Sequence, residues 1–213
     1  MTDTLISNAR IVRPSGTVMG GIAIEDGLIT AVGPGVADEH AAADERIDAE
    51  GMVALPGVVD VHNHMHDDEL FPEGIDFASE TASAVAGGVT TVVELPTQTP
   101  VTDAESFQTK RAACEERAHV DFGLVAGNVE DSDIDVASVM AEGTRDFKTF
   151  TADPYLADDR TIVELMTAVG KAGGKVRVHC ETQGILDHAR AQIDGDDPEV
   201  YMNSRPLDAE LDA

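Results

Sequence analysis

Apolar and polar positions alternate in short runs along residues 1–53, and this pattern predicts β-strands. The three clearest runs cover residues 5–12, 20–25 and 28–33. Asp26 and Gly27 separate the last two runs and form a dipeptide that is typical of a tight hairpin turn. We therefore expect residues 1–53 to form a small β-rich segment.

From residue 54 onward, apolar strands alternate with helical stretches. The predicted strands cover residues 53–61, 90–95, 120–126, 147–150 and 175–179. One predicted helix begins near Asp76, and the others cover residues 103–118, 136–141 and 159–172. Strands that alternate with helices predict βαβ units and a parallel sheet. A closed (β/α)₈ barrel takes about 250 residues, so residues 54–213 are predicted to form an incomplete barrel of about five strands. After Ala189 the chain turns acidic, and we expect a loop-like segment there.

Acidic residues outnumber basic ones by 41 to 14, which gives a formal net charge of -27. Such a surface repels nucleic acids and anionic membranes, so we expect neither as a partner. The acidic residues are spread along the whole chain, and four of the basic residues are lysines. This composition is typical of halophilic cytoplasmic proteins, in which concentrated salt screens the repulsion between carboxylates.

Cysteine usage and the N-terminus both favour a cytoplasmic protein. Cys114 and Cys180 do not form a disulfide framework or a Cys-x-x-Cys pair. The first residues lack the basic and apolar regions of a signal peptide, and no apolar run reaches the roughly 18 residues of a spanning helix. We expect a soluble protein in a reducing compartment.

Two histidines end the first predicted strand of the barrel segment. His62 and His64 are two residues apart, so on a strand their side chains point to the same face. The carboxyl end of a strand is the functional rim of a parallel α/β barrel. Two imidazoles in this position can bind a divalent cation such as zinc, but a pair of surface histidines has the same pattern. The pair alone leaves both interpretations open.

Lys148 and His179 lie on later predicted strands. Lys148 stands between Phe147 and Phe150, where an ammonium is costly to bury. Burial lowers the pKa of a lysine, and the neutral amine can react with carbon dioxide to give an anionic, bidentate carbamate. Alternatively, the side chain extends its amine to the solvent. His179 lies on the same rim, where a single histidine is more often a satisfied core residue.

Together these segments resemble the cyclic-amide branch of the amidohydrolase superfamily, which contains dihydroorotases, allantoinases and the hydantoinase or dihydropyrimidinase group. The segments are PGVVDVHNH at 56–64, AGGVTTVVELP at 86–96, FKTF at 147–150 and VHCE at 178–181. A later segment, DPEVYMNSRP at 197–206, resembles the hydantoinase and allantoinase side in particular. The resemblance runs from about residue 5 to the last residue and corresponds to the N-terminal portion of such enzymes.

The resemblance implies a fold, a cofactor and a reaction. The fold is a (β/α)₈ barrel preceded by part of a composite β-sandwich. His62 and His64 would bind the more buried of two divalent metal ions, with zinc as the family default. A carboxylated Lys148 would bridge the two ions, and His179 would bind the second. A metal-bound hydroxide would then hydrolyse a C–N bond of a cyclic amide or ureide.

Substrate contacts are the part of the family pattern from which this chain departs. His66 stands where dihydroorotases carry an arginine, which disfavours a dihydroorotase. Thr97 and Gln98 stand where dihydroorotases have asparagine and threonine. We expect His66, Thr97 and Gln98 to bind the substrate. Asp153 occupies the place of a hydantoinase tyrosine, and Tyr155 lies two residues further on.

Two family ligands come from outside the five predicted strands, namely a histidine on the sixth strand and an aspartate on the eighth. We therefore expect catalysis to require a C-terminal half, and we expect the chain to form a homo-oligomer or to associate with that half. The alternative is a non-catalytic truncated remnant, or a scaffold and assembly protein of the same fold. Assembly proteins related to dihydropyrimidinases tend to lose the ligands, whereas the four expected in this half are present.

Overall fold

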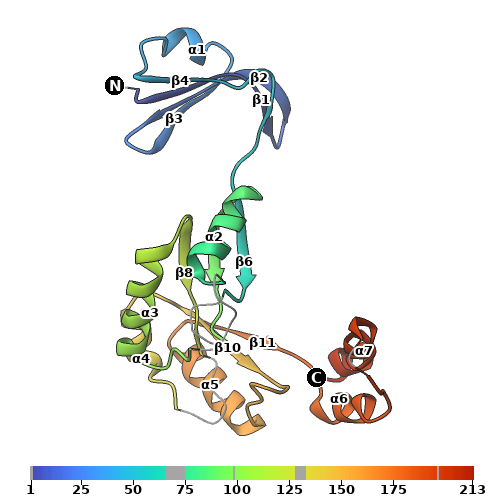
Figure 1. Cartoon of the computed structure of the whole chain (residues 1–213). Coiled ribbons are helices and arrows are strands. Elements are labelled where there is room, and N and C mark those ends of the chain that lie inside the picture. Colours follow the sequence, from blue (N-terminus) through green and yellow to red (C-terminus); the bar gives the residue numbers. More distant parts are fainter. Residues whose placement is uncertain (1, 66–74, 98, 128–132, 196) are drawn as a thin grey trace. The chain divides into compact units, whose positions relative to one another are not determined.

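The computed structural model describes residues 2–65, 75–97, 99–127, 133–195 and 197–213. The chain divides into two compact units, Met1–Gly57 and Val58–Ala213, which are described separately (Figure 1). The first unit is a sheet with one short helix, and the second alternates strands with helices. The protein is therefore of mixed α/β class. Within the described ranges, no helix has the length and apolar character needed to cross a membrane.

The first unit is a five-stranded sheet with the strand order β3-β2-β1-β4, in which β5 also pairs with β1. Its elements are β1 (Thr4–Arg13), β2 (Gly16–Glu25), β3 (Leu28–Gly33), α1 (Val36–Glu39), β4 (Glu45–Asp48) and β5 (Val53–Ala54). The predicted hairpin turn is confirmed between β2 and β3. Asp26 and Gly27 have φ angles of 51° and 73°, and positive φ at both central residues matches the twist of the flanking strands.

The sequence pattern predicted a single strand over residues 53–61, and this prediction is wrong. The first part of this run, β5, pairs with Arg10 and Ile11 of β1. The next strand, β6, covers Val58–Asn63 and belongs to the second unit. Pro56 lies between them, and proline has no N–H to donate to a sheet ladder. The run is therefore divided between the two units.

In the second unit, parallel strands follow one another in chain order. The elements are β6, α2 (Phe77–Ala86), β7 (Val89–Glu94), α3 (Ala104–Arg117), β8 (Asp121–Leu124), β9 (Ala126–Gly127), α4 (Val136–Ala141), β10 (Asp146–Phe150), α5 (Asp159–Lys171), β11 (Lys175–His179), α6 (Gln183–Arg190), α7 (Pro198–Asn203) and α8 (Leu207–Asp212). One parallel sheet contains β6, β7 and β8, and another contains β9, β10 and β11. Only Val125 separates β8 from β9, so the strand order follows the chain from β6 to β11.

The helices that connect these strands begin at the predicted places. Asp76, Asp103 and Asp158 are the N-caps of α2, α3 and α5, and each carboxylate accepts a hydrogen bond from the backbone N–H three residues later. Such a bond satisfies an N–H that has no partner within the helix. The pKa of each carboxyl lies below its ordinary value because of this backbone hydrogen bond.

The segment after Ala189 is helical in part, so the predicted loop-like character is wrong for α7 and α8. Asp197 accepts a hydrogen bond from the N–H of Glu199, and Pro198 occupies the first turn of α7. An aspartate N-cap followed by proline is a strong helix start, because the proline ring already has helical φ. Here local capping outweighs the acidic composition.

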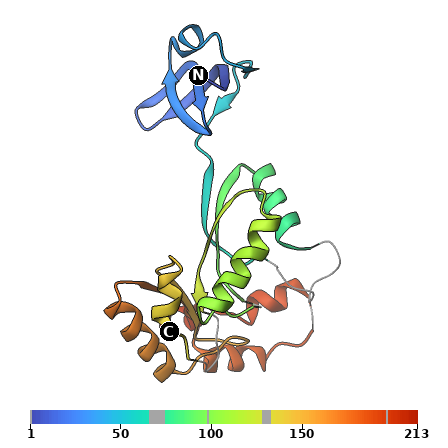
Figure 2. The ribbon, with the colours of Figure 1, turned by 90° about the vertical axis from the view of Figure 1, so that its left-hand side faces the viewer.

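The connecting helices pack against one face of the parallel strands (Figure 2). Their contacts form the main apolar cluster, which includes Phe77 of α2, Phe107 of α3, Val139 of α4 and Phe147 of β10. Because side chains alternate along a strand, Phe147 faces the helices while its neighbour Lys148 faces the other way. The opposite face of the sheets therefore carries the predicted ligands.

Candidate metal centre

His62 and His64 lie side by side at the carboxyl end of β6. The centroids of their rings are 5.5 Å apart, which confirms that the two side chains share one face. Nδ1 of His64 lies 2.8 Å from the carbonyl oxygen of Leu95. Because a carbonyl oxygen only accepts, this nitrogen carries the proton and Nε2 keeps its lone pair. Histidines that bind metals are usually held in this way, by a hydrogen bond from the other ring nitrogen.

Lys148 lies in the middle of β10, and only 1% of it is exposed. Its Nζ has no hydrogen-bond partner among the residues that the structure describes, and it lies 4.6 Å from the centroid of the Phe150 ring. Of the two interpretations that the sequence left open, burial is therefore confirmed, and the amine extended to the solvent is wrong. Burial lowers the pKa of Lys148; Cys180 acts in the opposite direction and the charge of Arg177 lowers the pKa further. These surroundings favour the neutral amine.

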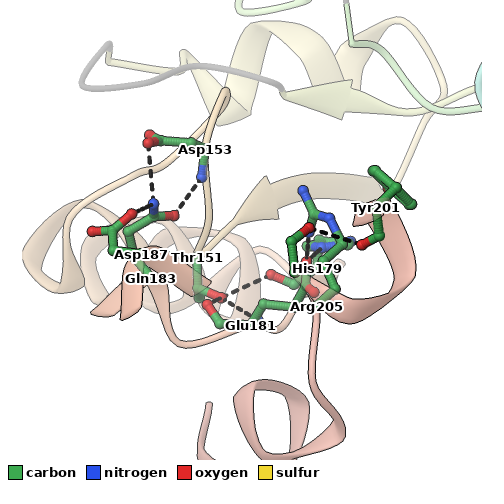
Figure 3. A network of polar contacts seen from close by, with 9 residues as sticks. Thr151, Asp153, His179, Glu181, Gln183, Asp187, Tyr201 and Arg205 are labelled. Atoms are coloured by element: carbon green, nitrogen blue, oxygen red, sulfur yellow. Dashed lines mark hydrogen bonds and ion pairs between the residues drawn. The ribbon is translucent and has the colours of Figure 1, made fainter. Parts of the chain in front are cut away.

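His179 ends β11, directly beside Phe150 in the strand register. Its Nε2 lies 2.5 Å from Oε2 of Glu181 (Figure 3). An ionised carboxylate only accepts, so Nε2 carries a proton, and in the neutral ring Nδ1 is the nitrogen that keeps a lone pair. The ring is thus held like that of His64, but through the opposite nitrogen.

The ring of Phe150 lies between the predicted ligands. Its centroid is 6.2 Å from that of His64 and 5.7 Å from that of His179. Lys148 lies on the same strand face and places its Nζ over this ring. The structure therefore brings His64, Lys148 and His179 around one aromatic side chain, with His62 next to His64.

Electrostatics keep the two β6 histidines neutral. Burial is the largest cause that lowers the pKa of His62, and the positive charge of Arg177 lowers it further. Burial also lowers the pKa of His64, and the hydrogen bond to Leu95 opposes this effect. A neutral imidazole has the lone pair that a metal ion needs, whereas an imidazolium has none. Both rings are thus prepared to act as ligands.

Lys148 decides whether these groups suit a metal ion. Within the described ranges, no three His, Cys, Asp or Glu side chains come close enough together to hold a metal ion. A lysine ammonium cannot add a ligand, because it has donors and no lone pair. A carbamate on the buried, unpartnered Nζ would supply anionic oxygens, which zinc binds together with imidazole nitrogens. The residues present fit a divalent metal when Lys148 is carboxylated.

One of the three predicted substrate-binding residues lies in the described ranges. Thr97 is half-buried and lies two residues after Leu95, whose carbonyl oxygen accepts the hydrogen bond from His64. His66 and Gln98 lie outside the described residues. The substrate-binding role of all three stays a prediction.

The structure also describes Asp153, which occupies the place of the hydantoinase tyrosine, and the nearby Tyr155. Asp153 is exposed, and its carboxylate accepts a hydrogen bond from Gln183 at 3.1 Å. Tyr155, two residues later, packs on Phe150 with 5.1 Å between ring centroids. Tyr155 therefore contacts the same aromatic ring as His64 and His179.

Sequence reasoning missed two contacts, one buried and one partly buried. Lys110 of α3 and Glu94 of β7 form an ion pair of 3.0 Å, and each side chain is 1% exposed. A signal existed, since Lys110 lies three residues after Phe107 and four before Cys114 on the apolar face of α3. The contact of Glu181 with Arg205 had no such signal, because it depends on how α7 and α8 fold back.

Comparisons with known proteins show which family the chain resembles. The chain is 36% identical over 222 residues to an allantoinase of Rubrobacter xylanophilus, and the match covers 99% of the chain and 48% of that protein. It is 32% identical over 220 residues to a dihydroorotase of Methanothermobacter thermautotrophicus, which covers 99% of the chain and 47% of that protein. No protein-family model matches.

A solved structure resembles the whole chain. The L-hydantoinase (dihydropyrimidinase) from Arthrobacter aurescens has a TM-score of 0.82 and 30% sequence identity, and the match covers 100% of this chain and 49% of that one. The chain thus spans about half the length of the relatives that it matches. By sequence and by fold, it belongs to the cyclic amidohydrolases, the group that includes allantoinases, hydantoinases and dihydroorotases.

Proposed function

We propose that this chain forms the metal-binding half of an enzyme that hydrolyses a C–N bond in a cyclic amide or ureide, of the allantoinase or hydantoinase kind. The observation that carries the proposal is the amine of Lys148, which is buried, has no hydrogen-bond partner within the described residues and shares Phe150 with two histidines. A buried cation without a partner is costly. A modified lysine that binds metal would explain why it is there.

The five parallel strand positions from β6 to β11 would be the first five strands of a (β/α)₈ barrel. Eight strands close such a barrel, so the complete pocket takes three strands beyond those described. These strands would come from a C-terminal half, either in the same polypeptide or in a separate chain. The substrate pocket would form at the carboxyl ends of the strands, where His62, His64 and His179 lie, with Lys148 further down β10 on the same face.

Each proposed ligand has a distinct task. The neutral amine of Lys148 would attack carbon dioxide, forming an N–C bond and releasing one proton, and the resulting carbamate would present two oxygens to two zinc ions. His62 and His64 would hold one ion, and His179 would hold the other. When bound, such ions lower the pKa of water and polarise an amide carbonyl. The phenyl ring of Phe150 would keep bulk water from the carbamate.

A carbon-13 experiment tests the modified lysine directly. The chain, alone and together with the C-terminal half, is incubated with zinc chloride and ¹³C-labelled bicarbonate and examined by ¹³C NMR. We expect a carbamate resonance that is lost in Lys148→Ala and kept in Lys171→Ala, because Lys171 is an exposed lysine near the end of α5. A wild-type protein with no carbamate resonance, or one that persists in Lys148→Ala, would contradict the proposal.

Metal content separates this function from that of a non-catalytic scaffold. An assembly protein does not need zinc, whereas the enzyme would bind two ions in wild type and fewer in Lys148→Ala. The substrate is then identified by incubating the complete protein with allantoin or hydantoin and measuring the loss of the ring amide. Full hydrolysis by a Lys148→Ala enzyme would exclude the proposed site.

A further inference from the structure

A polar network joins the end of β11 to the C-terminal helices (Figure 3). Glu181 lies at its centre. Its Oε2 accepts a hydrogen bond from Nε2 of His179 at 2.5 Å, and the same oxygen accepts one from Nη1 of Arg205. The exposed fraction is 12% for the side chain of Glu181, 27% for Arg205 and 43% for His179. The carboxylate is the most enclosed of the three and links the guanidinium to the imidazole.

Arg205 is itself held in place. It lies between α7 and α8, and its guanidinium carbon is 5.3 Å from the centroid of the Tyr201 ring, a contact that restricts its orientation. The N–H of Thr182, next to Glu181, donates to the carbonyl oxygen of Ala209 in α8 at 2.8 Å. The segment that carries Arg205 is therefore fastened to the end of β11 by a backbone contact that does not involve the guanidinium.

Thr151 fixes the backbone between His179 and Glu181. Its own N–H donates to the carbonyl oxygen of His179 at 2.9 Å, and its Oγ1 accepts the N–H of Glu181 at 2.8 Å. Oγ1 also lies 3.0 Å and 2.9 Å from the carbonyl oxygens of His179 and Glu181, and donates its single proton to one of them. With the backbone held, side-chain rotation is the freedom that remains.

We infer that Arg205 is a positioning residue, which acts through Glu181 to fix the ring of His179 with its proton on Nε2 and the lone pair of Nδ1 free for a metal ion. A neutral imidazole carries one ring proton, so an acceptor at one nitrogen assigns the lone pair to the other. A hydrogen bond to an ionised carboxylate is about twice as strong as a neutral one. Arg205 holds that carboxylate in the required rotamer.

This inference deepens the proposed function and rests on it, but its first test needs no metal. The exchange of the His179 ring proton with water is measured by NMR on the full ¹⁵N-labelled chain at one fixed pH. We expect a protected Nε2 proton in wild type. In Arg205→Ala, exchange should be about tenfold faster or more, the factor that corresponds to a hydrogen bond to a charged group.

Three variants separate positioning from a general effect on folding. Arg205→Lys should restore most of the protection, because an ammonium can still donate to Glu181. Glu181→Gln should keep part of it, because the amide oxygen still accepts from Nε2. Arg160→Ala is the matched control, since Arg160 pairs with Glu164 on the surface and its side chain is 81% exposed. Where Arg205→Ala does not fold by circular dichroism, Arg205→Gln takes its place.

Unchanged exchange in the Arg205 variants, or a wild-type ring with its proton on Nδ1, would overturn the inference. The second readout is zinc content after incubation with zinc chloride and bicarbonate. Arg205→Ala should lose one of two zinc ions and keep the one at His62 and His64. A wild-type protein that binds no zinc but shows Arg205-dependent protection would refute the proposed function and leave the positioning role intact.

Discussion

Replacing Lys110 with methionine would show how strongly the carboxyl end of β7 depends on a buried ion pair. Nζ of Lys110 and Oε1 of Glu94 are 3.0 Å apart, and both side chains are 1% exposed. Methionine approximates the length of the side chain but removes the charge, so the Glu94 carboxylate stays buried without this cation. Removing one partner of a buried pair costs about 3–5 kcal/mol, and we expect the free energy of unfolding to fall by that amount.

The same change should also disturb the hydrogen bond that holds His64 in the candidate metal centre. Leu95 follows Glu94 directly, and its carbonyl oxygen accepts the hydrogen bond from His64 at 2.8 Å.

The double variant Glu94→Gln with Lys110→Met removes both charges. Its cost should be smaller than that of Lys110→Met alone, because neither charge of the pair is left in the interior without the other.

Urea unfolding in molar salt is the assay for these variants. Both tyrosines of the chain, Tyr155 and Tyr201, lie in the second unit, and there is no tryptophan, so tyrosine fluorescence reports on that unit alone. Lys171→Met is the control at an exposed lysine. A cost for Lys110→Met below about 1 kcal/mol, the range of exposed ion pairs, would refute the reasoning.

Three further outcomes follow from charge, capping and the ligands. The melting temperature should rise from dilute buffer to molar salt, because salt screens the repulsion of a net charge of -27; equal values would contradict halophilic character. Asp103→Ala should melt earlier than wild type near neutral pH. A backbone hydrogen bond from Ser106 holds the pKa of Asp103 below 3.8, so this stabilisation exists above the ordinary pKa and the difference should vanish as the pH falls through the lowered one. His62→Ala should weaken zinc binding about 100-fold or more in titrations where the exposed His119→Ala has no effect.

The periodicity of apolar residues predicted most of the strands of the second unit. The apolar runs placed β7, β10 and β11 close to their observed bounds, and alternation put His62 and His64 on one face. The position of Lys148 between Phe147 and Phe150 offered a buried amine as one of two interpretations for the same local reason, and the structure shows the amine buried. These features depend on neighbours in sequence, which a pattern can show.

What the sequence did not reveal depends on tertiary packing or on single backbone groups. Pro56 divides a continuous apolar run because it cannot donate to a sheet ladder. The contact of Arg205 with Glu181 spans 24 residues and needs the folded position of α7 and α8. Composition predicted a loop where Asp197 in fact caps a helix.

The most direct test of the central claim is a crystal structure of the complete protein loaded with zinc and bicarbonate, with anomalous scattering measured at the zinc edge. The account predicts zinc within about 2.0–2.1 Å of ring nitrogens of His62 and His64, a second ion at Nδ1 of His179, and planar density for a carboxyl group on Nζ of Lys148 between them. Zinc bound elsewhere, or an unmodified Lys148 beside occupied metal sites, would contradict the account.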